Sequence, residues 1–305
     1  MSLRLYLAGL YTSNFDLGGT VFGKLTDPEK EARIGVKHYL ESYHYIHRES
    51  AIKKIRQDGK TVFLDSGAFS AFTKGVQVDL PGYCEYVKKN ADIIEVVDGV
   101  LCASVLDGIG DPLQTYQNQV AMESLGVKPL PCFHYGEDER YLEFYIANYE
   151  YVTIGGMVPI STPQLIHWLD RIWERHLTDG SGRPRVKVHG FGLTTMSLMK
   201  RYPWFSVDSS TWVQNAANGM IFLPGVGTLN ISSKSPSRKF ENQHLTTFTE
   251  IQRQAIIEYI RELGFDPDRL ADEYVSRWAF NCWAFTKEAE ASTLETYERA
   301  QPELF

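Results

Sequence analysis

Residues 129–157 read PLPCFHYGEDERYLEFYIANYEYVTIGGM, and this stretch decides the fold class. The runs 129–133 and 151–154 are short and apolar, as buried parallel strands are, and residues 139–147 between them read as a helix. A helix that connects two buried strands is typical of a parallel β–α–β unit with a right-handed crossover. The stretch therefore predicts an α/β protein.

The same alternation continues in both directions along the chain. Further candidate strands are residues 3–8, 61–64, 93–97, 100–105, 185–189 and 204–207. Further candidate helices are residues 28–42, 49–57, 80–90, 112–125, 163–176 and 194–201. Eight candidate strands favour a closed (β/α)8 barrel of the TIM type, although 93–97 and 100–105 lie close enough in the chain to form one strand.

The pattern changes after Asp208. Residues 219–233, GMIFLPGVGTLNISS, read as a β-hairpin with its glycines in or near the turn. Two long helices, residues 242–264 and 268–287, are expected to follow. We therefore predict a barrel domain over residues 1–240 that carries the hairpin as an insertion. A C-terminal helical extension over residues 241–305 would pack on that barrel.

Composition and charge exclude several classes of protein. The 305-residue chain is 43% hydrophobic, which excludes disorder, and its net charge of −7 excludes a protein that coats nucleic acid through overall charge. The four cysteines stand singly, which argues against a zinc ribbon and predicts reduced thiols. No apolar run reaches the ~18 residues of a membrane span, and the amino-terminal segment does not resemble a signal peptide. We expect a cytoplasmic protein with no membrane partner.

Polar residues gather where the predicted strands end. Asp65, Asp107 and Asp208 each follow such a strand, and so do His134 and His189. In barrel enzymes the carboxyl ends of the strands build the active site, so these side chains would line one mouth. Taken singly, each Asp also suits a helix cap or a turn, and each His suits a hydrogen-bonded structural position. Spacing alone indicates a barrel enzyme with a carboxylate-lined mouth.

The strand-end motifs and their order resemble the queuine and archaeosine tRNA-guanine transglycosylases. That family carries a TDSGGFQ-like segment, a VQG strand end, an IGGL strand end, an LMGVG segment and an FDCVxPTRNARNG segment. The similar segments here are LDSGAFS at 64–70, FHYG at 133–136, IGGM at 154–157, VHGFG at 188–192, and SVDSS at 206–210 leading to NAANG at 215–219. The resemblance spans roughly residues 60–235 and implies the barrel fold of that family.

The resemblance also implies a role for each matching residue. Asp208 would be the nucleophile that attacks C1′ of the target nucleoside and holds the sugar as a covalent ester, and Asp65 would be the general acid/base. Asp107 would accept hydrogen bonds from N1 and N2 of a guanine-like ring. The other implied substrate-binding positions are Ser66, His134, Gly155, Gly156, Met157 and His189, where His134 replaces a Gln and His189 a Met of the family.

Two features of the tRNA enzymes are missing from this sequence, namely the CxCxxC-plus-His zinc site and an added RNA-binding domain. No cysteine follows Asp208 before Cys282, and a lone His244, expected at the surface, cannot complete a four-ligand site. We therefore expect no cofactor, since the zinc ligand motif is absent, while a zinc site of a non-standard kind stays open on the sequence. The difference points to the DNA-guanine transglycosylases of phages and bacteria (DpdA-type), which exchange guanine in DNA for a 7-deazaguanine such as 7-cyano-7-deazaguanine (preQ0).

The expected partners are then DNA and a free 7-deazaguanine base, in the host cytoplasm if a phage encodes the protein. A target guanine must be flipped out of the duplex before its C1′ is accessible. Aromatic residues that could stack on it, or else pack in the core, are Phe69, Phe72, Tyr135, Phe191 and Trp212. Lys234, Arg238 and Lys239 could contact phosphates, or else form an ordinary solvated face.

Three alternatives stay open on the sequence alone. The chain could be a tRNA-guanine transglycosylase with a degenerate zinc region, a non-catalytic partner subunit of such an enzyme, or an unrelated barrel hydrolase or lyase that acts on a small sugar. Retention of both Asp65 and Asp208 argues against the partner subunit. The sequence predicts neither the oligomeric state nor which 7-deazaguanine is inserted.

Overall fold

The computed structural model describes residues 2–193 and 195–298. The chain forms two compact units, each assembled from separate parts of the sequence. Unit 1 comprises the described parts of Met1–Ser13, His38–Ser209 and Ala291–Phe305, and unit 2 comprises Asn14–Lys37 and Ser210–Glu290. The predicted domain boundary at residue 240 falls inside unit 2.

Unit 1 is an α/β fold built on a curled, seven-stranded parallel sheet with the order β3-β2-β1-β9-β8-β7-β6. Its strands are β1 (Arg4–Ala8), β2 (Tyr39–Ser42), β3 (Phe63–Asp65), β6 (Cys132–His134), β7 (Tyr151–Gly155), β8 (Lys187–Gly190) and β9 (Ser206–Ser209). The first strand pairs with the last, because Arg4 to Leu7 of β1 lie opposite Ser206 to Ser209 of β9. β1 and β9 therefore lie inside the sheet, and β3 and β6 form its two edges.

Between β3 and β6 the chain forms a short separate hairpin and isolated bridges. The short strands β4 (Val96–Val97) and β5 (Val100–Leu101) pair with each other in antiparallel fashion, because Asp98 and Gly99 both adopt positive φ and turn the chain back. Beyond β5, Ala103 bridges Leu64 and Ser104 bridges Leu130, both in parallel orientation. The prediction of a parallel α/β sheet is confirmed, but the described strands do not form a closed barrel of eight regular strands.

One strand of the sheet was predicted as helix. The structure has α1 (Asp27–Ile34), which ends at Gly35, and then β2, where a single helix over residues 28–42 was expected. Glu41 within β2 is buried and accepts hydrogen bonds from the backbone N–H and the hydroxyl of Thr12. A paired carboxylate in a buried strand interrupts the apolar run, and this interruption hid β2 in the sequence.

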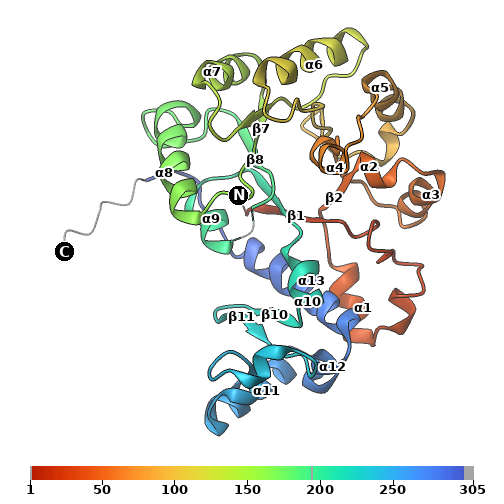
Figure 1. Ribbon diagram of the computed structural model, residues 1–305, viewed down its shortest axis with the longest axis vertical. Coiled ribbons are helices and arrows are strands. Elements are labelled where there is room, and N and C mark those ends of the chain that lie inside the picture. Colours follow the sequence, from red (N-terminus) through yellow and green to blue (C-terminus); the bar gives the residue numbers. More distant parts are fainter. Residues whose placement is uncertain (1, 194, 299–305) are drawn as a thin grey trace. The chain divides into compact units, whose positions relative to one another are not determined.

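The helices that follow the strands lie around the outside of the sheet (Figure 1). They are α2 (Tyr43–Ile46), α3 (Glu49–Gln57), α4 (Ala68–Thr73), α5 (Leu80–Lys89), α6 (Pro112–Ser124), α7 (Glu139–Asn148), α8 (Thr162–Ile172) and α9 (Met196–Arg201). Thr194, the first residue of the helix expected over 194–201, lies outside the described residues. Large buried side chains pack together on the sheet, among them Tyr6, Phe63, Leu130 and Tyr151. The polar groups described below lie at the strand ends.

Unit 2 is mainly helical and carries the predicted hairpin, formed by β10 (Met220–Leu223) and β11 (Gly227–Asn230). Its helices are α1, α10 (Thr211–Ala217), α11 (Glu250–Glu262), α12 (Pro267–Asp272) and α13 (Tyr274–Glu290). The predicted helix over 268–287 is therefore divided into α12 and α13, and the one expected from residue 242 begins at Glu250. In the described part of the chain, no helix has both the length and the apolar character that crossing a bilayer requires.

Candidate functional site

The three aspartates that the sequence singles out lie at the carboxyl ends of strands in unit 1. Asp65 is the last residue of β3, Asp208 lies in β9, and Asp107 follows the segment that bridges Leu64 and Leu130. Burial, together with the negative charges of Asp107 and Asp208, raises the pKa of Asp65 to about 7. The charges of both other aspartates act on Asp65, and all three residues lie where strands or bridges of unit 1 end, so Asp65, Asp107 and Asp208 are called the acidic cluster below.

Asp65 is held by the turn that joins β3 to α4. Its Oδ2 accepts a hydrogen bond of 3.0 Å from the backbone N–H of Gly67. Gly67 has φ of +76°, and a Cβ at this position would lie 2.6 Å from both the Cβ of His44 and the Oγ of Ser42. The glycine is therefore required both by the backbone conformation and by the close approach of β2. This geometry explains the Asp-Ser-Gly sequence at the strand end.

Asp208 is held by a backbone hydrogen bond and by contact with His189, which is itself hydrogen-bonded in the core. Its Oδ1 accepts a hydrogen bond of 2.9 Å from the backbone N–H of Gly192 and lies 3.4 Å from Nε2 of His189. The Nδ1 of His189 lies 2.6 Å from Oγ of Ser206, which in turn lies 2.6 Å from the hydroxyl of Tyr151. Burial lowers the pKa of His189. A fully buried histidine below Asp208 is better placed to orient that carboxylate than to contact a substrate.

His134 lies between two carboxylates at the end of β6. Glu137 accepts a hydrogen bond of 3.0 Å from the backbone N–H of His134 and lies 2.8 Å from its Nδ1. The Nε2 of His134 lies 3.4 Å from Oδ1 of Asp107 and 3.4 Å from Sγ of Cys132. Burial disfavours the charged ring, but Cys132, Asp107 and Glu137 together raise the pKa of His134 well above its usual range. Asp107, Cys132 and His134 are also a set of residues able to hold a metal ion.

The predicted ring-binding glycines leave space for His134. A Cβ at Gly155 would lie 3.0 Å from both Cys132 and His134, and a Cβ at Gly156, whose φ is +69°, would lie 3.1 Å from His134. Met157 is buried. The backbone N–H of Ser66 donates a hydrogen bond of 2.9 Å to Oγ of Ser104. All of the predicted substrate-binding residues thus lie in unit 1 with the three aspartates.

Some side chains at this site were not identified from the sequence. Glu137 fixes both the backbone and the ring of His134, and Cys132 lies against the same ring. Both residues could have been found from the sequence. Cys132 and His134 are two residues apart on one strand and therefore share a face, and Glu137 follows His134 by only three residues. Ser206 and Tyr151, which support His189, carry no comparable signal because they come from different strands.

The acidic cluster is reachable from solvent to a limited extent. The side chain of Asp208 is 9% exposed, that of Asp107 15% and that of His134 17%. Two aromatic residues of α4, Phe69 and Phe72, lie shortly after Asp65 in the chain and are more than half exposed. Both are thus available for stacking with a partner.

Two other aromatic residues that could have stacked on a base, Phe191 and Trp212, pack against side chains of the protein. The ring of Phe191 packs edge-on against Phe63 at 5.6 Å and against His189 at 4.5 Å. Trp212 is fully buried in unit 2, where it stacks on Phe15. For Trp212, core packing is therefore the better interpretation.

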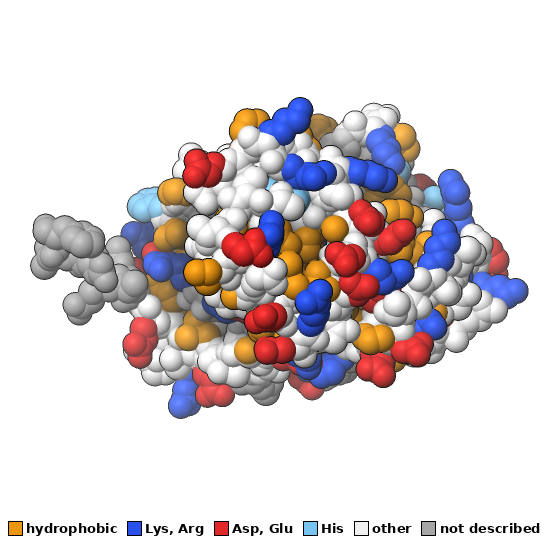
Figure 2. All heavy atoms as spheres, turned by 90° about the horizontal axis from the view of Figure 1, so that it is seen from below, with side chains coloured by type: hydrophobic (Ala, Val, Ile, Leu, Met, Phe, Trp, Pro, Cys, Tyr) orange, Lys and Arg blue, Asp and Glu red, His pale blue; other side chains and the backbone are white. Residues whose placement is uncertain are grey.

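The predicted phosphate-contacting residues Lys234, Arg238 and Lys239 are exposed in unit 2, beside or within a short 3-10 helix, Pro236–Lys239. On the face of the molecule seen in Figure 2, basic and acidic side chains are interspersed. His244 is buried, so its expected place at the surface was wrong. Its Nδ1 lies 2.9 Å from the hydroxyl of Thr246, and its Nε2 lies 3.0 Å from the carbonyl of Ser232.

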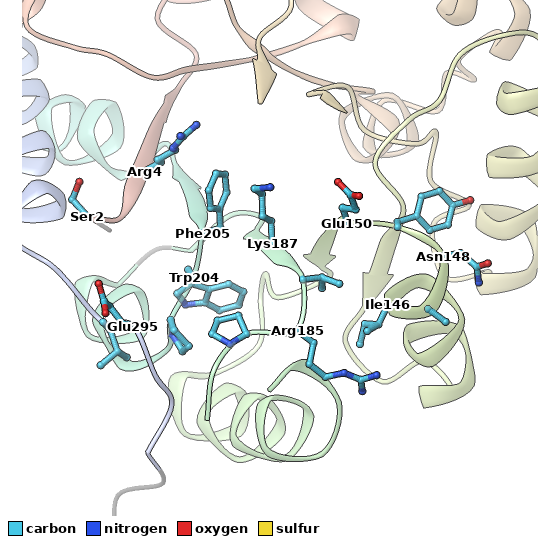
Figure 3. Close-up of a pocket in the computed structure, with 16 residues that line it drawn as sticks. Ser2, Arg4, Ile146, Asn148, Glu150, Arg185, Lys187, Trp204, Phe205 and Glu295 are labelled. Carbon is cyan, nitrogen blue, oxygen red and sulfur yellow. The ribbon is translucent and has the colours of Figure 1, made fainter. Parts of the chain in front are cut away.

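A cavity of about 900 Å³ lies at the opposite, amino-terminal ends of the strands of unit 1. Arg4, Phe205 and Lys187 lie along it (Figure 3), with the Arg4 guanidinium 4.5 Å and the Lys187 ammonium 5.6 Å from the centre of the Phe205 ring. In (β/α) folds this end of the sheet serves stability, whereas catalytic groups lie at the carboxyl ends. The carboxyl-end cluster is therefore the better candidate for the active site.

A comparison with models of known protein families and with curated protein sequences finds no match to this chain.

Proposed function

We propose that the protein is a DNA-guanine transglycosylase, which exchanges guanine in DNA for a 7-deazaguanine base, preQ0 or a related one, through a covalent aspartyl-glycosyl intermediate. The observation that carries the proposal is the convergence of Asp65, Asp107 and Asp208 at strand ends, within motifs ordered as in the guanine transglycosylases. Base exchange with retention at C1′ needs one carboxylate to attack and one carboxyl group to move protons.

The roles follow from the surroundings of each acid. Asp208 attacks C1′ as the bond from C1′ to N9 of guanine breaks, and Asp65 delivers its proton to the departing ring. The incoming base then gives its N9 proton to Asp65, and N9 displaces Asp208 from C1′. A pKa of about 7 suits Asp65 to this cycle, because the group can both release and accept a proton near neutral pH.

The remaining groups of the cluster bind and orient. The N–H of Gly192 and the ring of His189 hold Asp208 toward the sugar, and Asp107 accepts from the N1 and N2 donors of the ring. Exposed Phe69 and Phe72 are assigned to stacking with unpaired or neighbouring bases. Lys234, Arg238 and Lys239 are assigned to phosphate contacts from unit 2.

The same proposal treats unit 1 as a (β/α)8 barrel whose eighth strand is reduced to the bridges at residues 103 and 104. It implies an enzyme that needs no redox cofactor and acts in the cytoplasm, or in the host cytoplasm if a phage encodes it.

The test is mass spectrometry of nucleosides from duplex DNA incubated with the full-length protein and preQ0. We expect the preQ0 deoxynucleoside with the wild-type protein and none with Asp208→Ala. The control is Asp138→Asn, because Asp138 is an exposed carboxylate that caps α7. Incorporation into tRNA and not DNA, turnover of a small sugar without nucleic acid, or activity that survives Asp208→Ala would each refute the proposal.

A covalent intermediate gives a second, independent readout. Without the incoming base, the enzyme should form a DNA adduct that survives denaturation, and Asp208→Ala should abolish it. Circular dichroism of the variant establishes that it is folded, so that loss of the adduct reports on chemistry.

A further inference from the structure

Asp107, Cys132 and His134 direct three different ligand atoms toward one point in unit 1. A carboxylate oxygen, a thiol sulfur and an imidazole nitrogen of these residues all lie within 4.8 Å of one another. The His134 Nε2 is 3.4 Å from Cys132 Sγ and 3.4 Å from Asp107 Oδ1. Within the part of the chain that the structure describes, no other three residues of these types come together in this way.

These distances match the edges of a metal coordination tetrahedron. With metal–ligand bonds of about 2.0–2.3 Å, neighbouring nitrogen, oxygen and sulfur ligands of Zn²⁺ are about 3.3–3.6 Å apart. The two measured separations, both 3.4 Å, fall within this range. Two of the three edges therefore already have the length that a bound ion requires, and all three ligand atoms lie within 4.8 Å of one another.

The surroundings of His134 are those of a metal ligand. Its second ring nitrogen, Nδ1, lies 2.8 Å from Oε1 of Glu137, which fixes the ring and directs Nε2 toward Cys132 and Asp107. Metal-binding histidines typically donate their other ring N–H to a carboxylate in this manner. Gly155 leaves the space in which Cys132 and His134 approach each other, since a Cβ there would lie 3.0 Å from both.

One atom of the cluster lacks a partner. Oδ1 of Asp107 is inaccessible to solvent and has no hydrogen-bond partner of good geometry among the described residues, although Nε2 of His134 is 3.4 Å away. Leaving a buried carboxylate oxygen unpaired is unfavourable, and a bound cation would satisfy it.

We propose that Asp107, Cys132 and His134 bind one Zn²⁺ ion, with Glu137 as the residue that orients His134. A thiolate and an imidazole favour zinc over magnesium or calcium, which prefer oxygen ligands. Three protein ligands leave a fourth position for water or another ligand, as in zinc sites that take part in binding or catalysis. The proposal goes beyond base exchange and shares Asp107 and His134 with the proposed base-binding site: one oxygen of Asp107 binds zinc, and the other remains to accept from N1 and N2 of the ring.

The experiment is zinc analysis of the full-length protein, purified without chelator, by inductively coupled plasma mass spectrometry. We expect about one zinc per chain, falling at least about tenfold in Cys132→Ser and in His134→Ala. Cys84→Ser is the matched control, because Cys84 is an equally buried thiol of unit 1. In a zinc competition assay, Glu137→Gln should weaken binding about 10–100-fold.

Cobalt substitution identifies the ligand directly. The Co²⁺-loaded protein should show a thiolate-to-cobalt charge-transfer band that is lost in Cys132→Ser and kept in Cys84→Ser. If Cys132→Ser does not fold, Asp107→Asn and His134→Ala supply the same comparison through metal content. A protein that contains no zinc and takes up neither Zn²⁺ nor Co²⁺ would overturn the proposal, and so would zinc that all three ligand substitutions leave in place.

Discussion

Substitution of Asp65 by Asn should change how the stability of the protein depends on pH. Burial and the neighbouring Asp107 and Asp208 raise the pKa of Asp65 from 3.8 to about 7 in the folded protein, while the unfolded chain keeps the ordinary value. An acid whose pKa is raised by folding contributes stability that is fully present below the unfolded pKa and is lost as pH rises through the folded pKa. Three pH units correspond to about 4 kcal/mol, and solvent access to Asp65 reduces this to about 2–4 kcal/mol.

The variant Asp65→Asn cannot ionise, so the difference between variant and wild type isolates this one group. Urea unfolding should be measured at several pH values from about 4 to 8. As the pH rises from about 4 to about 7, the variant should gain about 2–4 kcal/mol of unfolding free energy relative to wild type, with little further gain above about pH 7. Asp138→Asn, which removes an exposed carboxylate, should show no such trend. A stability difference that stays constant with pH, or that favours the wild type at high pH, would show that Asp65 is not destabilised by its neighbours.

Three further substitutions test the structure by urea unfolding. Gly67→Ala should cost about 1–3 kcal/mol because of its positive φ and close contacts, whereas Gly59→Ala has only the conformational penalty, and equal losses would contradict the contact argument. Hydrogen bonds from Arg269 lower the pKa of buried Glu29 despite its desolvation, so Glu29→Gln should destabilise at pH 7 and progressively less as pH falls; a loss independent of pH would contradict this. Asn281→Leu should cost at least about 1–3 kcal/mol, because it leaves the backbone groups that the amide holds unpaired, and a neutral result would refute that role.

The parts of the fold that could be predicted are those in which a strand is an uninterrupted apolar run. The β–α–β unit from β6 to β7 was identified on this basis, and the hairpin of β10 and β11 was identified from the glycines in its turn. β2 was not, because it contains the buried Glu41, and the partner of Glu41, Thr12, lies 29 residues away in the chain. β4 and β5 were expected in the main sheet, but the Asp98-Gly99 turn pairs them with each other. A buried side chain with a distant partner hid β2, and a turn between β4 and β5 decided their pairing. Neither feature can be recognised from local hydrophobicity.

In the candidate site, too, the sequence predicts where residues lie but not what their side chains contact. Strand ends can be located from the sequence, so the acids and histidines that follow them could be named and expected to lie together. What their side chains do depends on contacts between strands that no local pattern encodes. His189 was expected to touch a substrate ring, yet it is fully buried with Ser206 on one side and Asp208 on the other. Cys132 was counted as an isolated thiol, yet it lies 3.4 Å from His134.

The partners of the three acids explain why they can act differently in one cluster. Asp107 lies 3.4 Å from the ring of His134, and Asp208 lies 3.4 Å from the ring of His189 and accepts an amide hydrogen bond from Gly192. Asp65 has the amide of Gly67 but no such histidine contact among the described residues. Three carboxylates at short range cannot all be ionised without cost, and the repulsion is relieved most readily where compensation is weakest. The raised pKa of about 7 therefore favours a proton on Asp65, whereas the proposed base exchange assigns the role of nucleophile to Asp208, which has the amide and histidine contacts.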